Sequence, residues 1–271
     1  MFFAKGHGAG NDFVLLPDPD GELDLTAELV ATLCARHFGI GADGVLRIVR
    51  TAKHPEAARY APDADWFMDY WNADGSLAEM CGNGVRVFAR YLTGYGLVDA
   101  TRFPVATRAG LVTVDVTPTE VSVDMPPPRL GADSVVRLAG TDYAGTAADV
   151  GNPHLVCPVD DVSTVDFREP PQLDATVFPE SANVEFVAAA EPLDGVDAHV
   201  RMRVYERGSA ETLACGTGAC AVAAVALRNA GLPAGTVALD LPGGRLSVML
   251  DEGRCVLTGP AVIVATGDIL I

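Results

Sequence analysis

Lysine is almost missing from this sequence. Of the 19 basic residues among 271, only Lys5 and Lys53 are lysines, and arginine supplies the rest. An enzyme that uses pyridoxal phosphate needs a lysine for the Schiff base. Lys5 lies near the terminus and Lys53 lies in a polar, loop-like stretch, so neither is placed for that role. The sequence therefore argues against pyridoxal phosphate as a cofactor.

Net positive charge and long apolar runs are also missing. With 36 acidic residues against 19 basic ones, the formal net charge is −17, which repels a phosphate backbone. No stretch approaches the roughly 18 consecutive apolar residues of a membrane span. The first residues lack the basic-then-apolar order of a signal peptide. We expect a soluble, cytoplasmic protein that binds neither nucleic acid nor membranes.

The sequence lacks a zinc-binding pattern as well. Its six cysteines include no Cys-x-x-Cys pair and its five histidines are scattered, so no metal site is expected. Without an export signal, the cysteines are expected to be reduced thiols. Four of them lie among apolar residues and are expected to be small core side chains: Cys34, Cys157, Cys220 and Cys255.

Apolar residues are plentiful, at 49% of the chain against 20% charged residues, which is enough to fill the core of one large domain or two ordinary ones. Alternating patterns predict strands at 65–71, 111–117, 121–125, 198–205, 236–241, 246–250 and 261–265. Helices are expected from the N-cap Thr26 to a stop at Gly39, over about 83–92, and over about 218–227. The third helix is apolar all round and should therefore be buried.

The two halves of the chain resemble each other. The segment 10–16 matches the segment 151–157, and the Cys-Gly-x-Gly turn at 81–84 matches the one at 215–218. A polar triplet stands nine residues before each cysteine, at 72–74 and 206–208. We infer a duplicated lobe that carries strands, one Cys-Gly-x-Gly turn and one helix.

The expected N-terminal lobe is 1–118, to which a C-terminal strand at 262–271 returns. The expected C-terminal lobe is 119–261. The proline run 126–128 marks a connection near the middle of the chain.

Each Cys-Gly-x-Gly turn places a cysteine, Cys81 or Cys215, just before a helix. Unpaired amides and the helix dipole favour negative charge there, so each thiol is expected to ionise more readily than a free thiol, whose pKa is about 8.5. The adjacent glycines let a carboxylate approach the same amides. Two such thiols that face one another across a cleft could remove a proton from one side of a carbon and return one to the other side.

Other functions account less well for the same residues. A cysteine hydrolase built from Cys81, His154 and Asn152 leaves Cys215 without a role. A non-catalytic amino-acid binding protein would explain a cleft but not two thiols. The G-x-G-x-x-G pattern at 39–44 follows a helix and precedes a strand, the reverse of the dinucleotide-binding order.

Further polar residues suit an amino-acid substrate. Asn11 and Asn152 occupy matching positions of the repeat. Glu206 offers a carboxylate for an ammonium group, and Arg207 offers a guanidinium fork for a carboxylate. A substrate with an amino-acid group at each end would fit both kinds of site.

The motifs at 6–13, 72–76, 80–86, 151–154, 206–208 and 214–218 together resemble the diaminopimelate epimerase family of pyridoxal-phosphate-independent racemases, over essentially the whole chain. The resemblance implies an α/β (α+β) fold of two pseudo-symmetric lobes, each a barrel-like mixed sheet around a central helix, with the active site in the cleft between them. It implies a homodimer that needs no cofactor and that converts LL- into meso-diaminopimelate for lysine and peptidoglycan precursors.

The resemblance also implies roles for individual residues. Cys81 and Cys215 would transfer the protons. The carboxylate at the reacting carbon would be held by Gly82, Asn83, Gly216 and Thr217. The rest of the substrate would be held by Asn11, Asn72, Asn152, Asn183, Glu206 and Arg207. His154 and Glu206 would tune the two thiols.

Two features depart from the family pattern. Gly44 stands where many relatives carry a glutamine, and 51–65 is longer than a simple hairpin turn. Proline racemases and hydroxyproline epimerases, the nearest alternative, usually carry a histidine after the first Cys-Gly and a different sequence before the second cysteine. Asn83 and the Glu206-Arg207 pair therefore favour a diaminopimelate epimerase. A phenazine-type isomerase lacks the cysteine pair.

Overall fold

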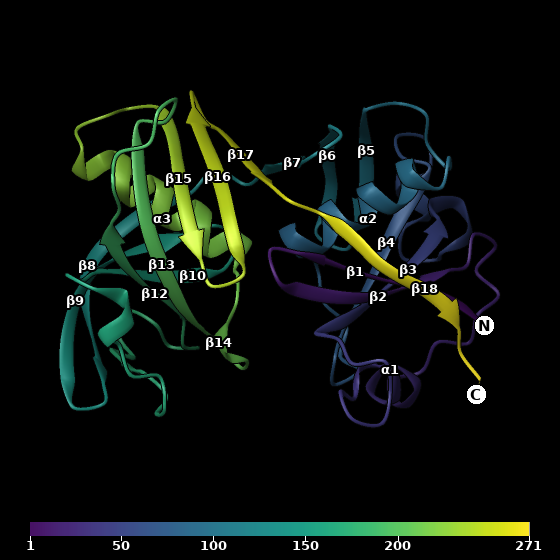
Figure 1. Ribbon diagram of the computed structural model, residues 1–271, viewed down its shortest axis with the longest axis horizontal. Coiled ribbons are helices and arrows are strands. Elements are labelled where there is room, and N and C mark those ends of the chain that lie inside the picture. Colours follow the sequence, from purple (N-terminus) through teal and green to yellow (C-terminus); the bar gives the residue numbers. More distant parts are fainter. Residues whose placement is uncertain (271) are drawn as a thin grey trace. The chain divides into compact units, whose positions relative to one another are not determined.

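The computed structural model describes residues 1–270, which form two compact units. Unit 1 comprises 1–123 together with the C-terminal stretch from Gly259, and unit 2 comprises 124–258. Each unit combines one mixed sheet with a helix packed against it, and Figure 1 labels these elements. The fold class is α+β, as predicted.

The sheet of unit 1 has eight strands. They are β1 (Phe2–Gly8), β2 (Asn11–Pro17), β3 (Gly44–Arg50), β4 (Trp66–Asn72), β5 (Arg102–Thr107), β6 (Gly110–Val116), β7 (Val121–Met125) and β18 (Val262–Asp268). They pair in the order β18-β1-β2-β3-β4-β5-β6-β7. The pairs β2–β3 and β4–β5 are parallel and the others antiparallel.

Unit 2 repeats this arrangement. Its main strands are β8 (Arg129–Leu138), β9 (Thr141–Asp149), β10 (Pro153–Pro158), β12 (Asn183–Ala189), β13 (Ala198–Glu206), β15 (Gly235–Leu241), β16 (Gly244–Asp251) and β17 (Arg254–Gly259). They pair in the order β8-β9-β10-β12-β13-β15-β16-β17, and only β10–β12 and β13–β15 are parallel. The short strands β11 (Gln172–Leu173) and β14 (Ala210–Thr212) add to β8 and β13. The same order of parallel and antiparallel pairs in both units confirms the predicted duplication.

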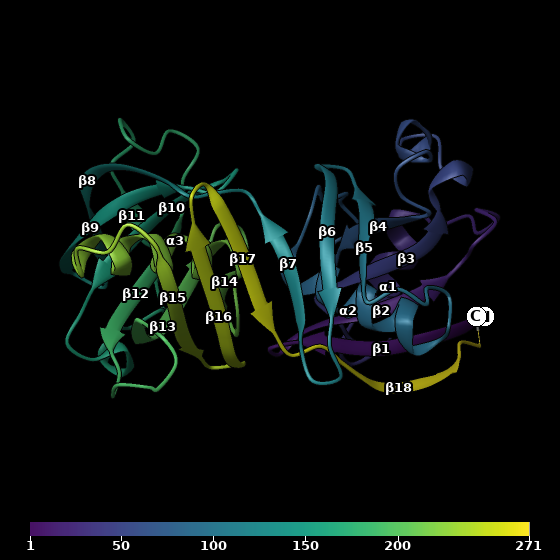
Figure 2. The same ribbon diagram turned by 90° about the horizontal axis from the view of Figure 1, so that it is seen from above.

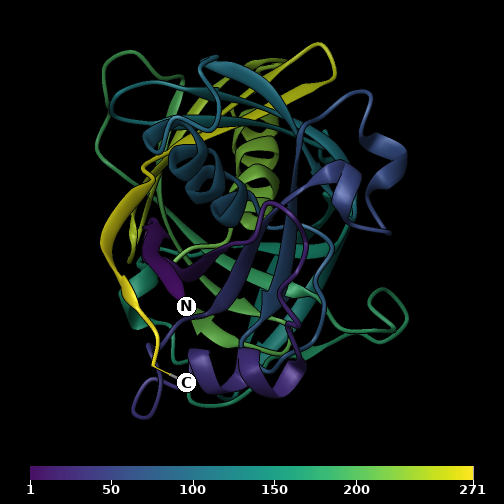
Figure 3. The same ribbon diagram turned by 90° about the vertical axis from the view of Figure 1, so that its right-hand side faces the viewer.

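A helix lies against the sheet of each unit. Helix α2 (Gly82–Gly94) contacts β1 and β18 at one end of the strand order and β6 near the other, so the sheet curves around it. Helix α3 (Gly216–Asn229) likewise contacts strands from β8 to β16. In Figures 2 and 3 strands surround both helices. Most of α3 is buried, as its apolar sequence predicts.

The remaining helix, α1 (Ala27–Cys34), begins as predicted, because the Thr26 side chain accepts a hydrogen bond from the Leu29 amide. Its predicted end at Gly39 is wrong. The helix ends at Cys34. The chain then turns back, and the amides of Ile40 and Gly41 both donate to the Leu33 carbonyl, which caps this end of the helix. Among the described residues, no helix is long and apolar enough to cross a membrane.

The long connection 51–65 of unit 1 contains two short 3₁₀ helices, Thr51–Lys53 and Ala58–Tyr60. An ion-pair network ties it to the sheet. Arg108 pairs with Glu56 of the connection at 2.7 Å and with the buried Asp69 of β4 at 2.5 Å.

None of the six cysteines, all of which lie within the described residues, is in a disulfide. The four that were expected to be core side chains are buried, which confirms that prediction.

Candidate active site

The first predicted thiol, Cys81, is the N-cap of α2. Its backbone is extended, and its Sγ accepts a hydrogen bond from the Gly84 amide at 3.4 Å. The sulfur thereby takes the place that a serine or aspartate oxygen usually fills at a helix start. Cys81 and the residues around it are called half-site 1.

Asn11 lies beside Cys81 in half-site 1. Its Oδ1 is 3.5 Å from the Cys81 Sγ, from which it accepts a hydrogen bond, and it also accepts one from Asn83 Nδ2 at 3.3 Å. The other side of the amide donates from Nδ2 to Asp43 Oδ2 at 2.8 Å. Asp43 therefore turns the carbonyl oxygen of Asn11 toward the thiol.

Arg86 fixes the orientation of the Asn83 side chain by a hydrogen bond. This arginine is fully buried in α2, and its Nη2 donates to Asn83 Oδ1 at 2.9 Å while Nη1 donates to the Gly82 carbonyl at 3.4 Å. With its oxygen taken up by Arg86, Asn83 directs its NH₂ group to Asn11. Neither Arg86 nor Asp43 was among the predicted site residues.

Asn72 ends β4 and pairs in register with Gly44 of the neighbouring strand. Its Nδ2 donates to Ser76 Oγ at 3.0 Å. A Cβ at Gly44 would lie 2.5 Å from the Trp71 carbonyl oxygen and 2.8 Å from the Tyr70 ring. The Tyr70 ring and the Trp71 carbonyl thus fill the space next to Gly44.

The second predicted thiol, Cys215, caps α3 in the same way. Its Sγ accepts from the Gly218 amide at 3.4 Å and lies 3.5 Å from Thr217 Oγ1. Only 6% of Cys215 is exposed. Cys215 and the residues around it are called half-site 2.

Charge and burial act strongly on Cys215. Burial raises the pKa of its thiol well above the ordinary value, and the carboxylates of Glu206 and Glu185 raise it further. Hydrogen bonds from Thr217 and the Gly218 amide offset only part of this rise. The predicted easier ionisation is therefore wrong for Cys215, because lost hydration and negative neighbours outweigh the helix N-terminus.

Glu206 itself is held at the end of β13. Burial raises the pKa of its carboxyl group, while hydrogen bonds from Thr212 and Cys215 act in the opposite direction. Its neighbour Arg207 donates its amide to Asn183 Oδ1 at 2.9 Å and a guanidinium N–H to the Glu180 carbonyl at 3.1 Å. The predicted residues Asn183, Glu206 and Arg207 thus lie together.

Asn152 and His154 come from the start of β10. His154 is fully buried, with Nε2 at 3.0 Å from Asn152 Oδ1 and Nδ1 at 2.7 Å from Glu185 Oε1. Asn152 Nδ2 in turn donates to Thr217 Oγ1 at 3.4 Å. Glu185, on β12, was missed by the sequence analysis.

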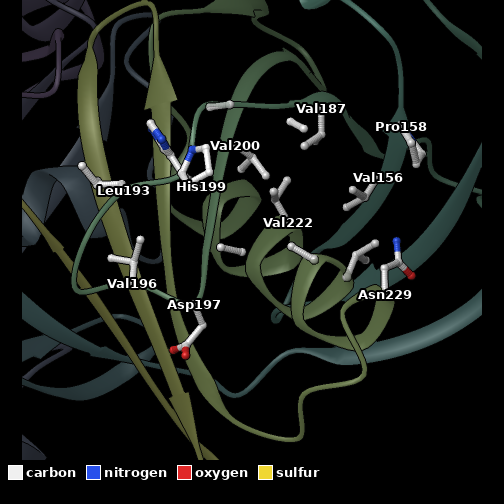
Figure 4. A pocket seen from close by; sticks show the side chains of 16 residues that line it. Val156, Pro158, Val187, Leu193, Val196, Asp197, His199, Val200, Val222 and Asn229 are labelled. Carbon is white, nitrogen blue, oxygen red and sulfur yellow. The ribbon is translucent and has the colours of Figure 1, made fainter.

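A separate cavity of about 450 Å³ lies in unit 2, and none of the predicted site residues lines it. Its walls include Val156, Val187, Val200 and Val222, from the inner faces of strands and from α3 (Figure 4). In the part of the chain that the structure describes, no cluster of three or more His, Cys, Asp or Glu side chains is suited to hold a metal ion.

Comparison with solved structures finds the same fold at low sequence identity. A phenazine biosynthesis protein of the PhzF family from Bacillus anthracis matches with a TM-score of 0.71 and 17% identity over 100% of this chain and 99% of that one. A hydroxyproline epimerase from Agrobacterium vitis, with trans-4-hydroxy-L-proline bound, matches with a TM-score of 0.65 and 16% identity over 99% and 90% of the two chains.

Sequence comparison is more specific. The family model for diaminopimelate epimerase matches residues 3–131 and 146–264. Diaminopimelate epimerases from Thermobifida fusca and Corynebacterium glutamicum are 54% and 47% identical to this chain, over 99% of its length and 98% of theirs. The chain therefore belongs to the diaminopimelate epimerase family and is an isomerase.

Proposed function

We propose that this enzyme converts LL-diaminopimelate into meso-diaminopimelate by proton transfer between the substrate and two cysteines, without a cofactor. The observation that carries the proposal is the matched pair of thiols. Cys81 and Cys215 occupy equivalent places in a duplicated fold, and each Sγ is fixed 3.4 Å from the amide of the third helix residue. The Thermobifida fusca relative supplies the substrate by its name.

In the proposed reaction one cysteine is a thiolate and the other a thiol. The thiolate takes the α-proton, so that an S–H bond forms while the C–H bond breaks and its electron pair stays on the carbon. The thiol then gives its proton to the opposite face of that carbon. The two cysteines exchange protonation states, the net charge is unchanged, and the reverse reaction starts from the exchanged pair.

The raised pKa of the Cys215 thiol suits the role of acid at the start of the cycle. We therefore assign Cys81 as the base for the substrate that meets the resting enzyme. The rates of α-proton exchange, measured with each stereoisomer, would show which of the two reacts with the resting enzyme.

The carbanion needs stabilisation by groups that are already oriented. The amides of Gly82 and Asn83 at one helix start, and of Gly216 and Thr217 at the other, are proposed to hold the carboxylate of the reacting carbon. Fixed dipoles of this kind lower a barrier because they need no reorganisation during the reaction. The proposal requires that both half-sites enclose one substrate molecule and exclude water from it.

The far end of the substrate would be held by the remaining polar residues. Arg207 would pair with the distal carboxylate, and Glu206 with an ammonium group. Asn11, Asn72, Asn152 and Asn183 would complete the contacts. A proline-like substrate has no distal amino-acid group to use these contacts, and it is the alternative that the experiment below includes.

The proposed setting is the biosynthesis of lysine and peptidoglycan precursors in the cytoplasm, where the two thiols stay reduced. We also propose a homodimer. β18 lies at the edge of the unit 1 sheet, and Val262 and Val264 are 42% and 54% exposed on it. Sedimentation would show a dimer, and Val264→Asp is expected to shift it toward monomer. A wild-type monomer at micromolar concentration would refute this part.

The deciding experiment is an exchange assay. Reduced enzyme is incubated with LL-diaminopimelate in deuterated water without added cofactor, and with L-proline in parallel. Meso product that carries solvent deuterium at the α-carbon is the expected result. Exchange into proline alone would keep the mechanism and replace the substrate, and exchange into neither would refute the proposal.

A further inference from the structure

The two units differ in what lies beneath their helix starts. In the strand register Phe13 pairs with Gly44 in unit 1, as His154 pairs with Asn183 in unit 2. Two residues further along these strands, Leu46 of unit 1 therefore corresponds to Glu185 of unit 2. Unit 2 has an ionisable pair where unit 1 has two apolar side chains.

Both pairs fill the same kind of space. A Cβ at Gly84 of α2 would touch the side chains of Leu46 and Phe13, at 3.4 and 3.5 Å, and a Cβ at Gly218 of α3 would meet the Glu185 carboxyl group at 2.6 Å. Unit 1 shows that leucine and phenylalanine fill such a space. The fold therefore does not require Glu185 and His154 for packing.

Burial of these two ionisable side chains is energetically unfavourable. Glu185 and His154 are both 0% exposed, and among the described residues Glu185 Oε2 has no hydrogen-bond partner. Buried ionisable groups cost several kcal/mol unless they are well compensated. A pair that packing does not require and that burial penalises calls for a role of another kind.

The positions of the hydrogens on the His154 ring and the Glu185 carboxyl group identify that role. Asn152 presents its carbonyl Oδ1 to His154 Nε2, so Nε2 must carry a hydrogen. One further proton lies between Nδ1 and Glu185 Oε1, 2.7 Å apart. The pair is then neutral overall, which suits a fully buried site. If Nε2 lost its hydrogen, it would accept from the NH₂ group of Asn152, and the amide would turn over.

We infer that Glu185 is a positioning residue, which keeps a hydrogen on His154 Nε2 so that Asn152 directs its NH₂ group to Thr217 and the start of α3. The inference rests on the proposed function, in which Asn152 and Thr217 bind the substrate. It adds a residue that makes no substrate contact and acts through His154.

Other ionisable groups surround the pair. Asp149 and Glu206 interact electrostatically with His154, and Glu206 also interacts with Glu185. The thiols of Cys157 and Cys215 feel the Glu185 charge. A change of charge at position 185 will therefore alter the pH profile of the reaction, which is why the test separates charge from proton position.

Two variants make that separation. Glu185→Gln removes the charge, but its amide can still donate to Nδ1, which keeps the hydrogen on Nε2. Glu185→Leu introduces the residue found at the matching position of unit 1 and leaves His154 Nδ1 without a partner. The hydrogen of the ring is then no longer held on Nε2 in preference to Nδ1. Glu185→Leu is expected to raise KM for LL-diaminopimelate about tenfold, the effect of one lost hydrogen bond. Glu185→Gln is expected to keep KM within about threefold and to shift the pH profile.

The direct readout is the ¹⁵N chemical shift of the His154 ring nitrogens in substrate-free enzyme, with the spectrum of His154→Phe as the assignment control. We expect a protonated Nε2 in the wild type and in Glu185→Gln, and an averaged signal in Glu185→Leu. An unprotonated Nε2 in the wild type, or unchanged shifts and KM in Glu185→Leu, would overturn the inference. Equal damage in both variants would overturn it as well, since charge alone would then matter.

The double variant His154→Phe/Glu185→Leu covers the case in which Glu185→Leu fails to fold. It recreates the apolar pair of unit 1 and is expected to melt at or above the wild-type temperature, with KM raised as in Glu185→Leu. A double variant with the wild-type KM would contradict the inference. Because the ring shifts are measured without turnover, they test Glu185 even where the proposed reaction fails.

Discussion

The two half-sites use the same backbone and thiol but orient their asparagines in opposite directions. In half-site 1 Asp43 accepts from the NH₂ group of Asn11, which leaves the carbonyl oxygen facing Cys81. In half-site 2 His154 faces the carbonyl of Asn152, which leaves the NH₂ group facing Thr217. A duplicated fold has thus kept the helix caps while one site gained an acceptor and the other a donor.

Removal of either thiol should have the largest effect. Cys81→Ala and Cys215→Ala are each expected to lower kcat for LL-diaminopimelate by about 10³-fold, because each removes one acid–base group. Cys255→Ala, at a buried cysteine of β17 outside both half-sites, serves as the control. Full turnover by either single variant would show that the matched thiols are not the acid–base pair.

The next effect concerns Gly44, whose counterpart in unit 2 is Asn183. Gly44→Ala is expected to lower the free energy of unfolding by about 2 kcal/mol, since its Cβ meets the Trp71 carbonyl oxygen at 2.5 Å and backbone must move. Thermal unfolding measures this as a drop in Tm of about 5 °C.

Gly94→Ala is the matched control, because nothing lies within 4 Å of a Cβ there and the backbone is not left-handed. Equal Tm values for the two variants would show that Tyr70 and Trp71 leave room at position 44.

A smaller effect is expected from Asp43, which orients Asn11. Asp43→Ala frees the Asn11 amide and should raise KM about tenfold, comparable with one hydrogen bond, while the thermal midpoint changes little. The exposed Asp20→Ala is the control. If KM stays at the wild-type value, Asn11 is held by Asn83 alone and the contrast with half-site 2 is weaker than it looks.

The smallest expected change is a displacement along the pH axis. Glu206 raises the pKa of the Cys215 thiol, because a nearby negative charge disfavours a thiolate. Glu206→Gln removes that charge, so the pH midpoint for alkylation of Cys215 by iodoacetamide should move to lower pH. Mass spectrometry of each cysteine provides the rates, with Cys81 as the internal reference. A midpoint that stays or rises would contradict this account.

Sequence patterns predicted the elements best where they alternate or begin with a cap. The strand 121–125 and the start of α1 at Thr26 agree with the structure. β2 was missed because Val14, Leu15 and Leu16 are all buried, and a run without alternation does not distinguish a strand from a helix. β8 was missed for the opposite reason, since most of it is exposed.

The chemistry was predictable where it repeats along the chain and hidden where it depends on pairing between distant strands. Matching turns pointed to Cys81 and Cys215. Glu185 meets His154 only because β10 and β12 lie parallel, and a glutamate inside an apolar strand carries no signal of its own. The raised pKa of Cys215 was hidden for the same reason, since it depends on burial and on carboxylates brought in from other strands.

The cysteine caps join chemistry to folding. The sulfur of each proposed acid–base cysteine is also the acceptor for the amide of the third residue of its helix, and a lost cap costs about 1 kcal/mol. In the proposed reaction, oxidation of either thiol to a sulfinic acid would end proton transfer and at the same time add two oxygens to the atom that caps α2 or α3. Under the proposed mechanism, an oxidised molecule would therefore lose both its acid–base group and the native cap of a buried helix.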